Sequence, residues 1–259
     1  MSNDQEWNRI VQDRLKQMAT RATERRDWLS NTGKSKNIDK YIRICGESYR
    51  AVSLNEASPL MGFVKNNAKN IDTILDHFKK GEPSKINGNG RPERKLQSWL
   101  IKQSLQNKLS LKSALALDDE KYDDLLFALD EVSLGDNNHQ PIIRCDILAV
   151  GLQNGNAFPV LIELKSARDK ARLIEQLESF VHRIEQFRNE FEELLSNCVN
   201  KKVSASDKIG KMVIWPKNMT ARQESADQFH EKGTDVIEYD WDHISDIKNI
   251  EFSAYYSKR

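Results

Sequence analysis

The sequence predicts an α/β protein in which a mixed central β-sheet is flanked by helices and preceded by a small helical region. Before residue 80, apolar residues recur at helical spacing. Residues 81–92 then hold three Gly and two Pro, a composition typical of a linker or long loop. Beyond them, helical and strand-like patterns alternate, which favours a sheet with helices on both faces. We therefore expect a helical N-terminal region at 1–80, a linker at 81–92 and an α/β domain at 93–259.

The overall composition is that of an ordinary soluble protein. Of the 259 residues, 31% are charged and 38% are hydrophobic. No apolar run reaches the roughly 18 to 20 residues that a membrane span needs, and the N-terminal sequence lacks the pattern of a signal peptide. The three cysteines are scattered without CxxC spacing. We therefore expect reduced thiols, a cytoplasmic location and no membrane partner.

The net charge of +1 is unevenly distributed along the chain. Residues 1–100 hold 19 Lys and Arg against 12 Asp and Glu, whereas the remainder holds 21 against 27. A basic region that meets a polyanion and an acidic region that meets cations would produce this asymmetry. Solvated helix faces that happen to differ would produce it equally well.

An amphipathic helix is expected at the N-terminus. Its apolar stripe consists of Trp7, Val11, Leu15 and Met18. Arg14, Arg21 and Arg25 fall on a different face, where they are candidates for contacts with nucleic-acid phosphates. The helix could equally serve dimerisation or partner docking, or its stripe could pack on the second domain.

A helix is also expected directly after the linker. Pro92 suits the first position of a helix, because the missing N–H is not needed there. Glu93 shares the inward face of this helix with Leu96 and Leu100.

The rest of the chain predicts further elements. Residues 116–134 are expected to be irregular. A long amphipathic helix is expected from the apolar stripe Leu173, Leu177, Phe180, Ile184, Phe187, Phe191 and Leu194. Strands are expected at 208–216 and 234–241, with a helix at 220–232 between them.

Two apolar strands around Asn154-Gly155 form a predicted hairpin. A type I′ turn requires positive φ at both central positions, which Asn and Gly tolerate. If the turn is simple, Gln153 pairs with Asn156, and this pair sets the register of both strands. A bulge at Pro159 could shift that register.

The two strands of the hairpin carry four charges. In the simple register Asp146 lies opposite Glu163, and Arg144 lies opposite Lys165. Alternation places all four side chains on one face of the sheet. The other face receives the apolar set Ile143, Cys145, Ile147, Val160, Ile162 and Leu164.

Two opposed carboxylates repel each other, and burial increases the repulsion. Arg144 and Lys165 could neutralise them as a buried ionic cluster, although such clusters are often no more stable than apolar packing. A divalent cation is the more natural partner, because Mg²⁺ binds one or two carboxylates together with waters and phosphate oxygens. The sequence therefore predicts a metal site on Asp146 and Glu163.

These strands resemble those of the PD-(D/E)XK nuclease superfamily. "RCDILAV" is similar to the motif whose aspartate, here Asp146, ends a core strand, and "VLIELKSA" is similar to the E-x-K strand. Acid-x-Lys triplets occur four times in the chain, but only Glu163-Leu-Lys165 ends an apolar strand behind an aspartate-bearing one. The sequence departs from the motif at Cys145, which stands where the family name has proline.

The flanking helices extend the likeness to roughly residues 91–241. "ERKLQSWL" resembles the leading helix of the family, whose glutamate would be Glu93. "IEQLESF" resembles its glutamine motif, with Gln176 followed by Phe180 where tyrosine is frequent. The resemblance implies a restriction-endonuclease-like core at 93–259, Mg²⁺- or Mn²⁺-dependent hydrolysis of phosphodiester bonds in DNA, and by analogy a homodimer.

The resemblance also implies roles for individual residues. The ion would be held by Asp146, Glu163 and the backbone carbonyl of Leu164. Lys165 would orient or deprotonate the attacking water, and Glu93 would brace the water shell or hold a second ion. Two further roles concern Gln176, which would orient Lys165 or touch the phosphate, and Arg144, which would contact a phosphate or pair with Asp146.

Each of these residues also has a structural interpretation. The two acids and Lys165 could be solvated side chains of a one-sided sheet, and Glu93 could merely favour the helix dipole. Gln176 is of a type common on helices, and His139 lies in a loop where histidines are usually just exposed. Two other functions therefore stay open: a catalytically inactive nucleic-acid-binding or assembly subunit, and an interaction protein with a structural ionic cluster.

Overall fold

The computed structural model describes residues 92–105, 109–118, 121–134, 143–165, 172–217, 226–240 and 250–257, with residues 5, 8, 9, 11–13, 15, 16 and 18–20 near the N-terminus. Most of the predicted N-terminal region and nearly all of the predicted linker lie outside the described residues. The same holds for Trp7, Arg14, Arg21, Arg25 and His139.

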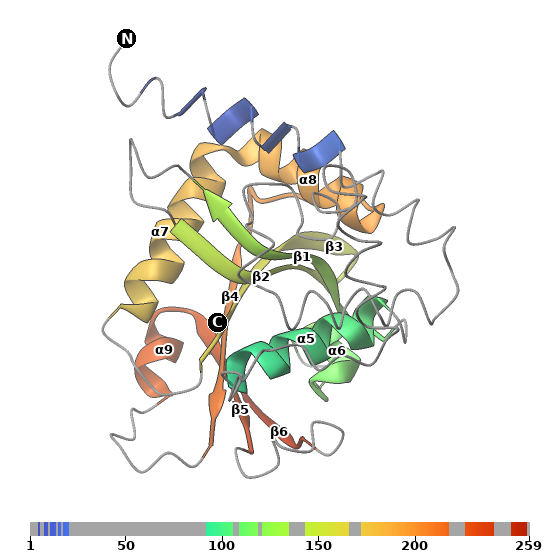
Figure 1. Ribbon diagram of the computed structural model, residues 1–259, viewed down its shortest axis with the longest axis vertical. Coiled ribbons are helices and arrows are strands. Elements are labelled where there is room, and N and C mark those ends of the chain that lie inside the picture. The colour runs from blue at the N-terminus through green and yellow to red at the C-terminus, as the bar shows by residue number, and fades with distance from the viewer. Residues whose placement is uncertain are drawn as a thin grey trace, which may run out of the picture.

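The strands of the described part are β1 (Asp124–Leu134), β2 (Ile143–Gln153), β3 (Asn156–Leu164), β4 (Gly210–Pro216), β5 (Thr234–Tyr239) and β6 (Phe252–Tyr255). They form one mixed sheet in which the strands follow each other in chain order (Figure 1). β3, β4 and β5 run parallel, and the other neighbours are antiparallel. The predicted mixed sheet is confirmed.

Helices cover both faces of this sheet (Figure 1). The helices α5 (Pro92–Leu105) and α6 (Leu111–Ala114) pack on one face, and the buried cluster there, which includes Leu96, Leu100 and Ile162, is called the α5-side cluster. The opposite face carries α7 (Leu173–Gln186), α8 (Arg188–Val199) and α9 (Asp227–Glu231). Its buried cluster, which includes Leu161 and Phe180, is called the α7-side cluster. In the described part of the chain, no helix combines the length and apolar character that a membrane crossing requires.

The described N-terminal residues are helical and pack on the α7-side cluster. Val11, Leu15, Met18 and Ala19 are all buried there. The side-chain amide of Asn197 on α8 donates to the carbonyl of Ala19 at 3.2 Å. One of the interpretations left open for this helix is therefore observed: its described apolar residues pack against the sheet, α7 and α8.

The predicted hairpin turn is confirmed. Asn154 and Gly155 have φ of 52° and 79°, as a type I′ turn requires. Gln153 pairs with Asn156, and the register continues without a shift. Pro159 introduces no bulge. Gln153 and Asn156 form the hydrogen-bonded pair beside the turn, and hydrogen-bonded and non-hydrogen-bonded pairs alternate from there, so Pro159 lies opposite Val150 in a non-hydrogen-bonded pair. At such a position β2 needs no N–H from proline.

Two expectations about secondary structure are wrong, and one strand was missed. Residues 116–134 are not irregular throughout, because β1 begins at Asp124 and pairs with β2. The long helix at 173–194 is broken at Phe187, whose φ of −115° and ψ of 43° are not helical. The strand β6, paired with β5, was not expected. Within the expected helix at 220–232, the described residues contain α9 at Asp227–Glu231, and residues 220–225 lie outside the described part.

Candidate functional site

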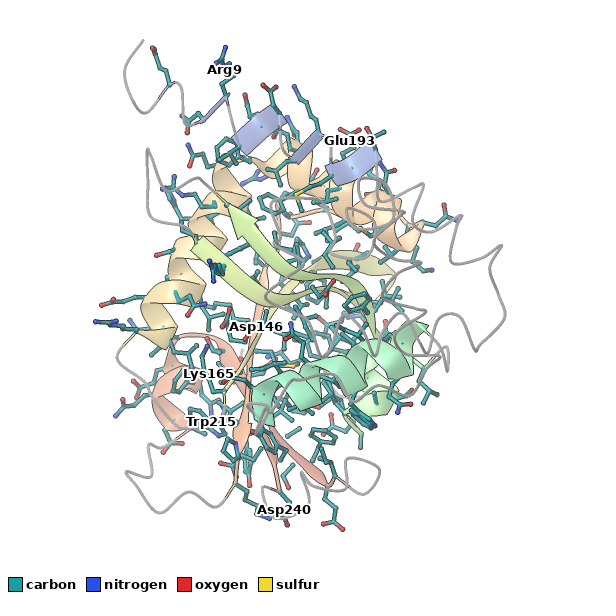
Figure 2. All side chains as sticks on the ribbon, in the orientation of Figure 1. Arg9, Asp146, Lys165, Glu193, Trp215 and Asp240 are labelled. Atoms are coloured by element: carbon teal, nitrogen blue, oxygen red, sulfur yellow. The ribbon has the colours of Figure 1, made fainter. Side chains whose placement is uncertain are left out.

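The hairpin strands separate where Asp146 and Glu163 lie. The regular pairing of β2 with β3 ends at Ile147 and Ile162. Beyond it, the backbone N–H of Leu164 donates to Oδ2 of Asp146 at 2.8 Å. A carboxylate oxygen thus occupies the place of a ladder carbonyl, which holds the Asp146 side chain against the end of β3. Figure 2 marks the positions of Asp146 and Lys165.

This separation makes the expected division of the strands into two faces partly wrong. Ile147, Ile162 and Leu164 belong to the α5-side cluster, as expected for side chains on one face of the sheet. Cys145 and Ile143 instead pack with the α7-side cluster. The alternation of β2 slips between Cys145 and Ile147, where pairing with β3 stops and the thiol of Cys145 bonds to the carbonyl of Ile147 at 3.1 Å.

Three of the predicted residues come together at this point. Nζ of Lys165 lies 2.9 Å from Oε2 of Glu163 in a salt bridge. Glu163 is 1% exposed, whereas the Lys165 side chain is 26% exposed and half-buried Asp146 also reaches solvent. The two acids and the amine therefore form a compact group, here called the carboxylate pair with Lys165, in which Asp146 and Lys165 are half-buried.

Burial and mutual repulsion perturb the acids. Burial raises the pKa of Glu163 well above its usual value, and the charge of Asp146 raises it further. Burial also raises the pKa of Asp146, although Lys165 and the N–H of Leu164 partly offset the rise. Burial opposes the charge on Lys165, but Glu163 and Asp146 outweigh it and raise the pKa of the amine. The group therefore retains a proton more readily than separate acids would.

Glu93 is near this group but not in its centre. It lies in the first turn of α5, is half-buried, and its charge contributes to the raised pKa values of Asp146, Lys165 and Tyr239. Within the described residues, no group of three or more His, Cys, Asp or Glu side chains is close enough to hold a metal ion. Glu93 is thus close enough for its charge to act on Asp146 and Lys165, as a residue that contacts the water shell of a bound ion would be.

The donor set still fits one hard cation. Two carboxylates are enough for Mg²⁺ when waters complete the shell. The N–H of Leu164 points to Asp146, and in a strand the N–H and C=O of one residue point to the same side, so the Leu164 carbonyl is directed there too. A cation between the two acids would also remove the repulsion that raises the pKa of Glu163.

Arg144 lies at the start of β2, two residues before Asp146, and Gln176 lies on α7. The amide Nε2 of Gln176 donates to the backbone carbonyl of Arg144 at 3.0 Å. Arg144 itself is exposed. The observed bond of Gln176 is therefore to the strand backbone, and no bond from it to Lys165 is observed among the described residues.

Two residues of the site were missed from the sequence. Gln97 on α5 is 3% exposed and donates to the backbone carbonyl of Asp146 at 2.8 Å. Its spacing of four residues from Glu93 placed it on the same helix face, which was a usable signal. The hydroxyl of Tyr239 donates to the carbonyl of Lys165 at 3.0 Å, and burial followed by the charge of Glu93 raises the pKa of this hydroxyl. Nothing local in the sequence marks Tyr239.

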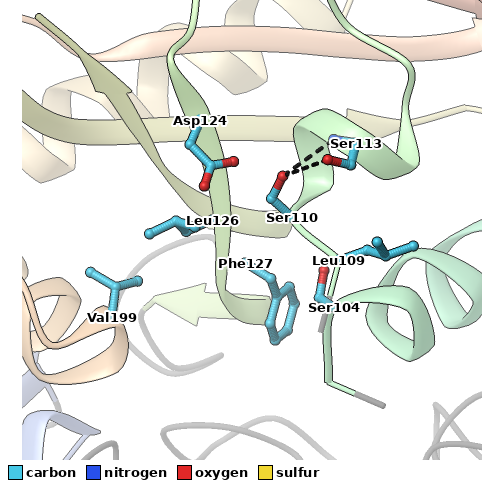
Figure 3. Close-up of a pocket in the computed structure, with 8 residues that line it drawn as sticks. All are labelled: Ser104, Leu109, Ser110, Ser113, Asp124, Leu126, Phe127 and Val199. Atoms are coloured by element: carbon cyan, nitrogen blue, oxygen red, sulfur yellow. Dashed lines mark hydrogen bonds between the residues drawn. The ribbon is translucent and has the colours of Figure 1, made fainter. Parts of the chain in front are cut away.

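A pocket of about 500 Å³ lies apart from these residues, beside α6 and β1 (Figure 3). Two of its serines, Ser110 and Ser113, bond to each other at 3.3 Å. Its acid, Asp124, accepts the N–H of Leu125. The described residues that line this pocket include no Lys, Arg, His or Cys, so Asp124 is the one ionisable side chain among them.

Comparison of the chain with models of protein families, with curated proteins and with solved structures finds no match. The functional interpretation therefore depends on the geometry of the carboxylate pair with Lys165 and on the sequence resemblance.

Proposed function

We propose that the protein is a metal-dependent nuclease that hydrolyses phosphodiester bonds, with DNA as the expected substrate and Mg²⁺ or Mn²⁺ as the cofactor. The observation that carries the proposal is the carboxylate pair with Lys165, which lies where the regular pairing of β2 with β3 has ended. Its residues are the ones that the PD-(D/E)XK resemblance assigns to catalysis, and the leading helix and the following helix both lie beside them.

A second buried ionic group in the same protein shows what a structural cluster looks like. Asp235, 1% exposed, accepts bonds from Lys121, from the hydroxyl of Tyr122 and from both the N–H and the hydroxyl of Ser257. One acid there meets one cation and three further donors. Among the described residues, the carboxylate pair instead has two acids that share a side-chain hydrogen bond with each other, one cation and the N–H of Leu164. That shortage of donors supports a binding role for the pair.

The proposed roles follow from these contacts. Asp146, Glu163 and the carbonyl of Leu164 would hold the ion, which when bound polarises the phosphate and lowers the pKa of a bound water. Lys165 keeps its proton because its pKa is raised, so it would neutralise the phosphate and orient the water by donating hydrogen bonds. Glu93 would contact the water shell. Gln97 and Tyr239 hold the backbone at Asp146 and Lys165.

The test is cleavage of linear, circular and single-stranded DNA with Mn²⁺. Glu163→Gln should reduce cleavage more than about 100-fold, because a ligand matters at least as much as the groups that support it. Glu193→Gln, which changes an exposed acid on α8, is the matched control and should cleave as the unchanged chain does. Cleavage by Glu163→Gln at the control rate would overturn the proposal.

The salt bridge between Lys165 and Glu163 favours a second candidate, a nucleic-acid-binding subunit that does not cleave. Lys165 already neutralises one acid, so the group can persist without an ion. In this case DNA binds, no substrate is cut, and Mn²⁺ leaves the melting temperature unchanged. Indifference to both DNA and Mn²⁺ would instead indicate an interaction protein with a structural cluster.

A further inference from the structure

A pocket of about 450 Å³ lies between the start of β2 and the first turns of α7. Its lining consists of Ile143, Arg144, Arg172, Glu175, Gln176 and Ser179. Arg144 precedes Asp146 by two residues, a step of about 7 Å along a strand. The pocket lining therefore includes a residue two positions before Asp146 of the proposed catalytic group.

The described lining of the pocket carries two arginines, Arg144 and Arg172, against one acid, Glu175. Arg144 and Arg172 are both exposed, and in the described part of the chain neither guanidinium makes a salt bridge. Lys211 offers a contrast, because its amine is paired with Glu178 of α7 at 2.5 Å. Two cations that share a pocket repel each other, so an anion bound between them would be favoured.

The backbone under this pocket is fixed. Gln176 holds the carbonyl of Arg144, which anchors the start of β2 to α7. This contact gives Gln176 a role different from the two that the resemblance implies: it positions the strand that carries Arg144. Ser179, one turn further along α7, adds a hydroxyl donor to the same lining.

We infer that this pocket binds a phosphate of the nucleic-acid strand adjacent to the phosphate that is cleaved. The inference rests on the proposed function and names the part of the substrate that the pocket recognises. Arginine is suited to it, because its planar guanidinium donates two parallel hydrogen bonds to phosphate oxygens. Glu175 is the acid among the lining residues, and its charge weakens the site.

The first experiment measures binding of a fluorescent DNA duplex without divalent cations, by anisotropy over a range of salt concentrations. Arg144→Gln and Arg172→Gln should each weaken binding about 5- to 10-fold and lower the salt slope by about 1. Glu175→Gln should strengthen binding about 2-fold. Arg188→Gln, at an exposed position of α8, is the matched control. If the pocket variants bind as Arg188→Gln does, or if the unchanged chain binds no DNA, the inference is wrong.

The second experiment separates this inference from the proposed function. In a Mn²⁺-dependent cleavage assay, Arg172→Gln should raise KM about 5- to 10-fold and change kcat less than about 2-fold. Normal cleavage kinetics for Arg172→Gln would reject the pocket and leave the nuclease proposal standing. Pocket-dependent DNA binding without any cleavage would support the pocket and reject the nuclease proposal. Gln176→Ala should show the same rise in KM as Arg144→Gln, and an unchanged KM would reject its positioning role.

Discussion

Asp146 combines two tasks in one side chain. Its Oδ2 atom accepts the N–H of Leu164, which fixes the carboxylate in place. Its charge also raises the pKa of Glu163, because the two carboxylates of the pair repel each other. Substitutions that separate the hydrogen bond from the charge can therefore distinguish folding from metal binding.

Asp146→Asn should preserve the fold, because an amide oxygen can still accept the N–H of Leu164. Asp146→Ala should lower the free energy of unfolding by about 1–3 kcal/mol, because this buried N–H then has no acceptor from residue 146. Urea denaturation measures both values. In a Mn²⁺-dependent cleavage assay both variants should be inactive, and an active Asp146→Asn would count against metal binding.

The carboxylate pair also predicts how stability depends on pH. Between the usual carboxyl pKa of 4.5 and the raised pKa of Glu163, the folded chain holds a proton that the unfolded chain has released. The folded state therefore binds more protons, and the free energy of unfolding falls as pH rises through this interval, by at most about 1.4 kcal/mol per pH unit for one proton.

Urea denaturation from pH 5 to 8 tests this dependence. Glu163→Gln should flatten the fall, since the titrating group is gone. Mg²⁺ should stabilise the unchanged chain increasingly toward pH 8, because binding requires the unprotonated acids. An identical pH profile for Glu163→Gln and the unchanged chain, with no effect of Mg²⁺, contradicts the prediction.

At the scale of elements, the open end of β3 is held from three directions. The N–H of Lys165 donates to Ile214 at the end of β4, and its carbonyl accepts from Tyr239 at the end of β5. The N–H of Leu164 is held by Asp146 on β2. Hydrogen bonds thus hold the backbone of Lys165 in place, although β3 itself ends at Leu164.

Tyr239→Phe should therefore loosen the site without unfolding it. The free energy of unfolding should fall by about 1 kcal/mol, the usual effect of one lost hydrogen bond. Hydrogen exchange should show faster exchange at the N–H of Lys165. Tyr255→Phe, at a 42% exposed position of β6, is the control and should change neither measurement. Equal protection at Lys165 in both variants would mean that the Tyr239 contact does not hold the strand.

The parts of this arrangement that depend on local chemistry could be predicted from the sequence. Asn154-Gly155 dictated the turn and the turn dictated the register, which brought Asp146 close to Glu163. The parts that depend on distant contacts could not. β1 was missed because a short apolar run is ambiguous until β2 pairs with it, and Tyr239 was missed because its partner lies 74 residues away.

At the scale of the molecule, the sheet separates two buried clusters with different tasks. The α5-side cluster holds the leading helix and Gln97 against the carboxylate pair. The α7-side cluster joins α7 and α8 to the described N-terminal residues. Leu15 is fully buried there. The described residues of the N-terminal helix thus contribute to the core around the sheet.

Leu15→Ala tests whether this helix belongs to the same folding unit. Removing a fully buried leucine costs about 2–5 kcal/mol, so the free energy of unfolding of the whole chain should fall by that amount in a single transition. Leu109→Ala, at a 44% exposed position, is the matched control and should cost less than about 0.5 kcal/mol. Two-state urea curves followed by Trp fluorescence and by circular dichroism should coincide for the unchanged chain and both variants. If Leu15→Ala instead shows an early separate transition while the sheet unfolds at the control concentration, the N-terminal helix folds independently and the expected boundary at 81–92 divides two units.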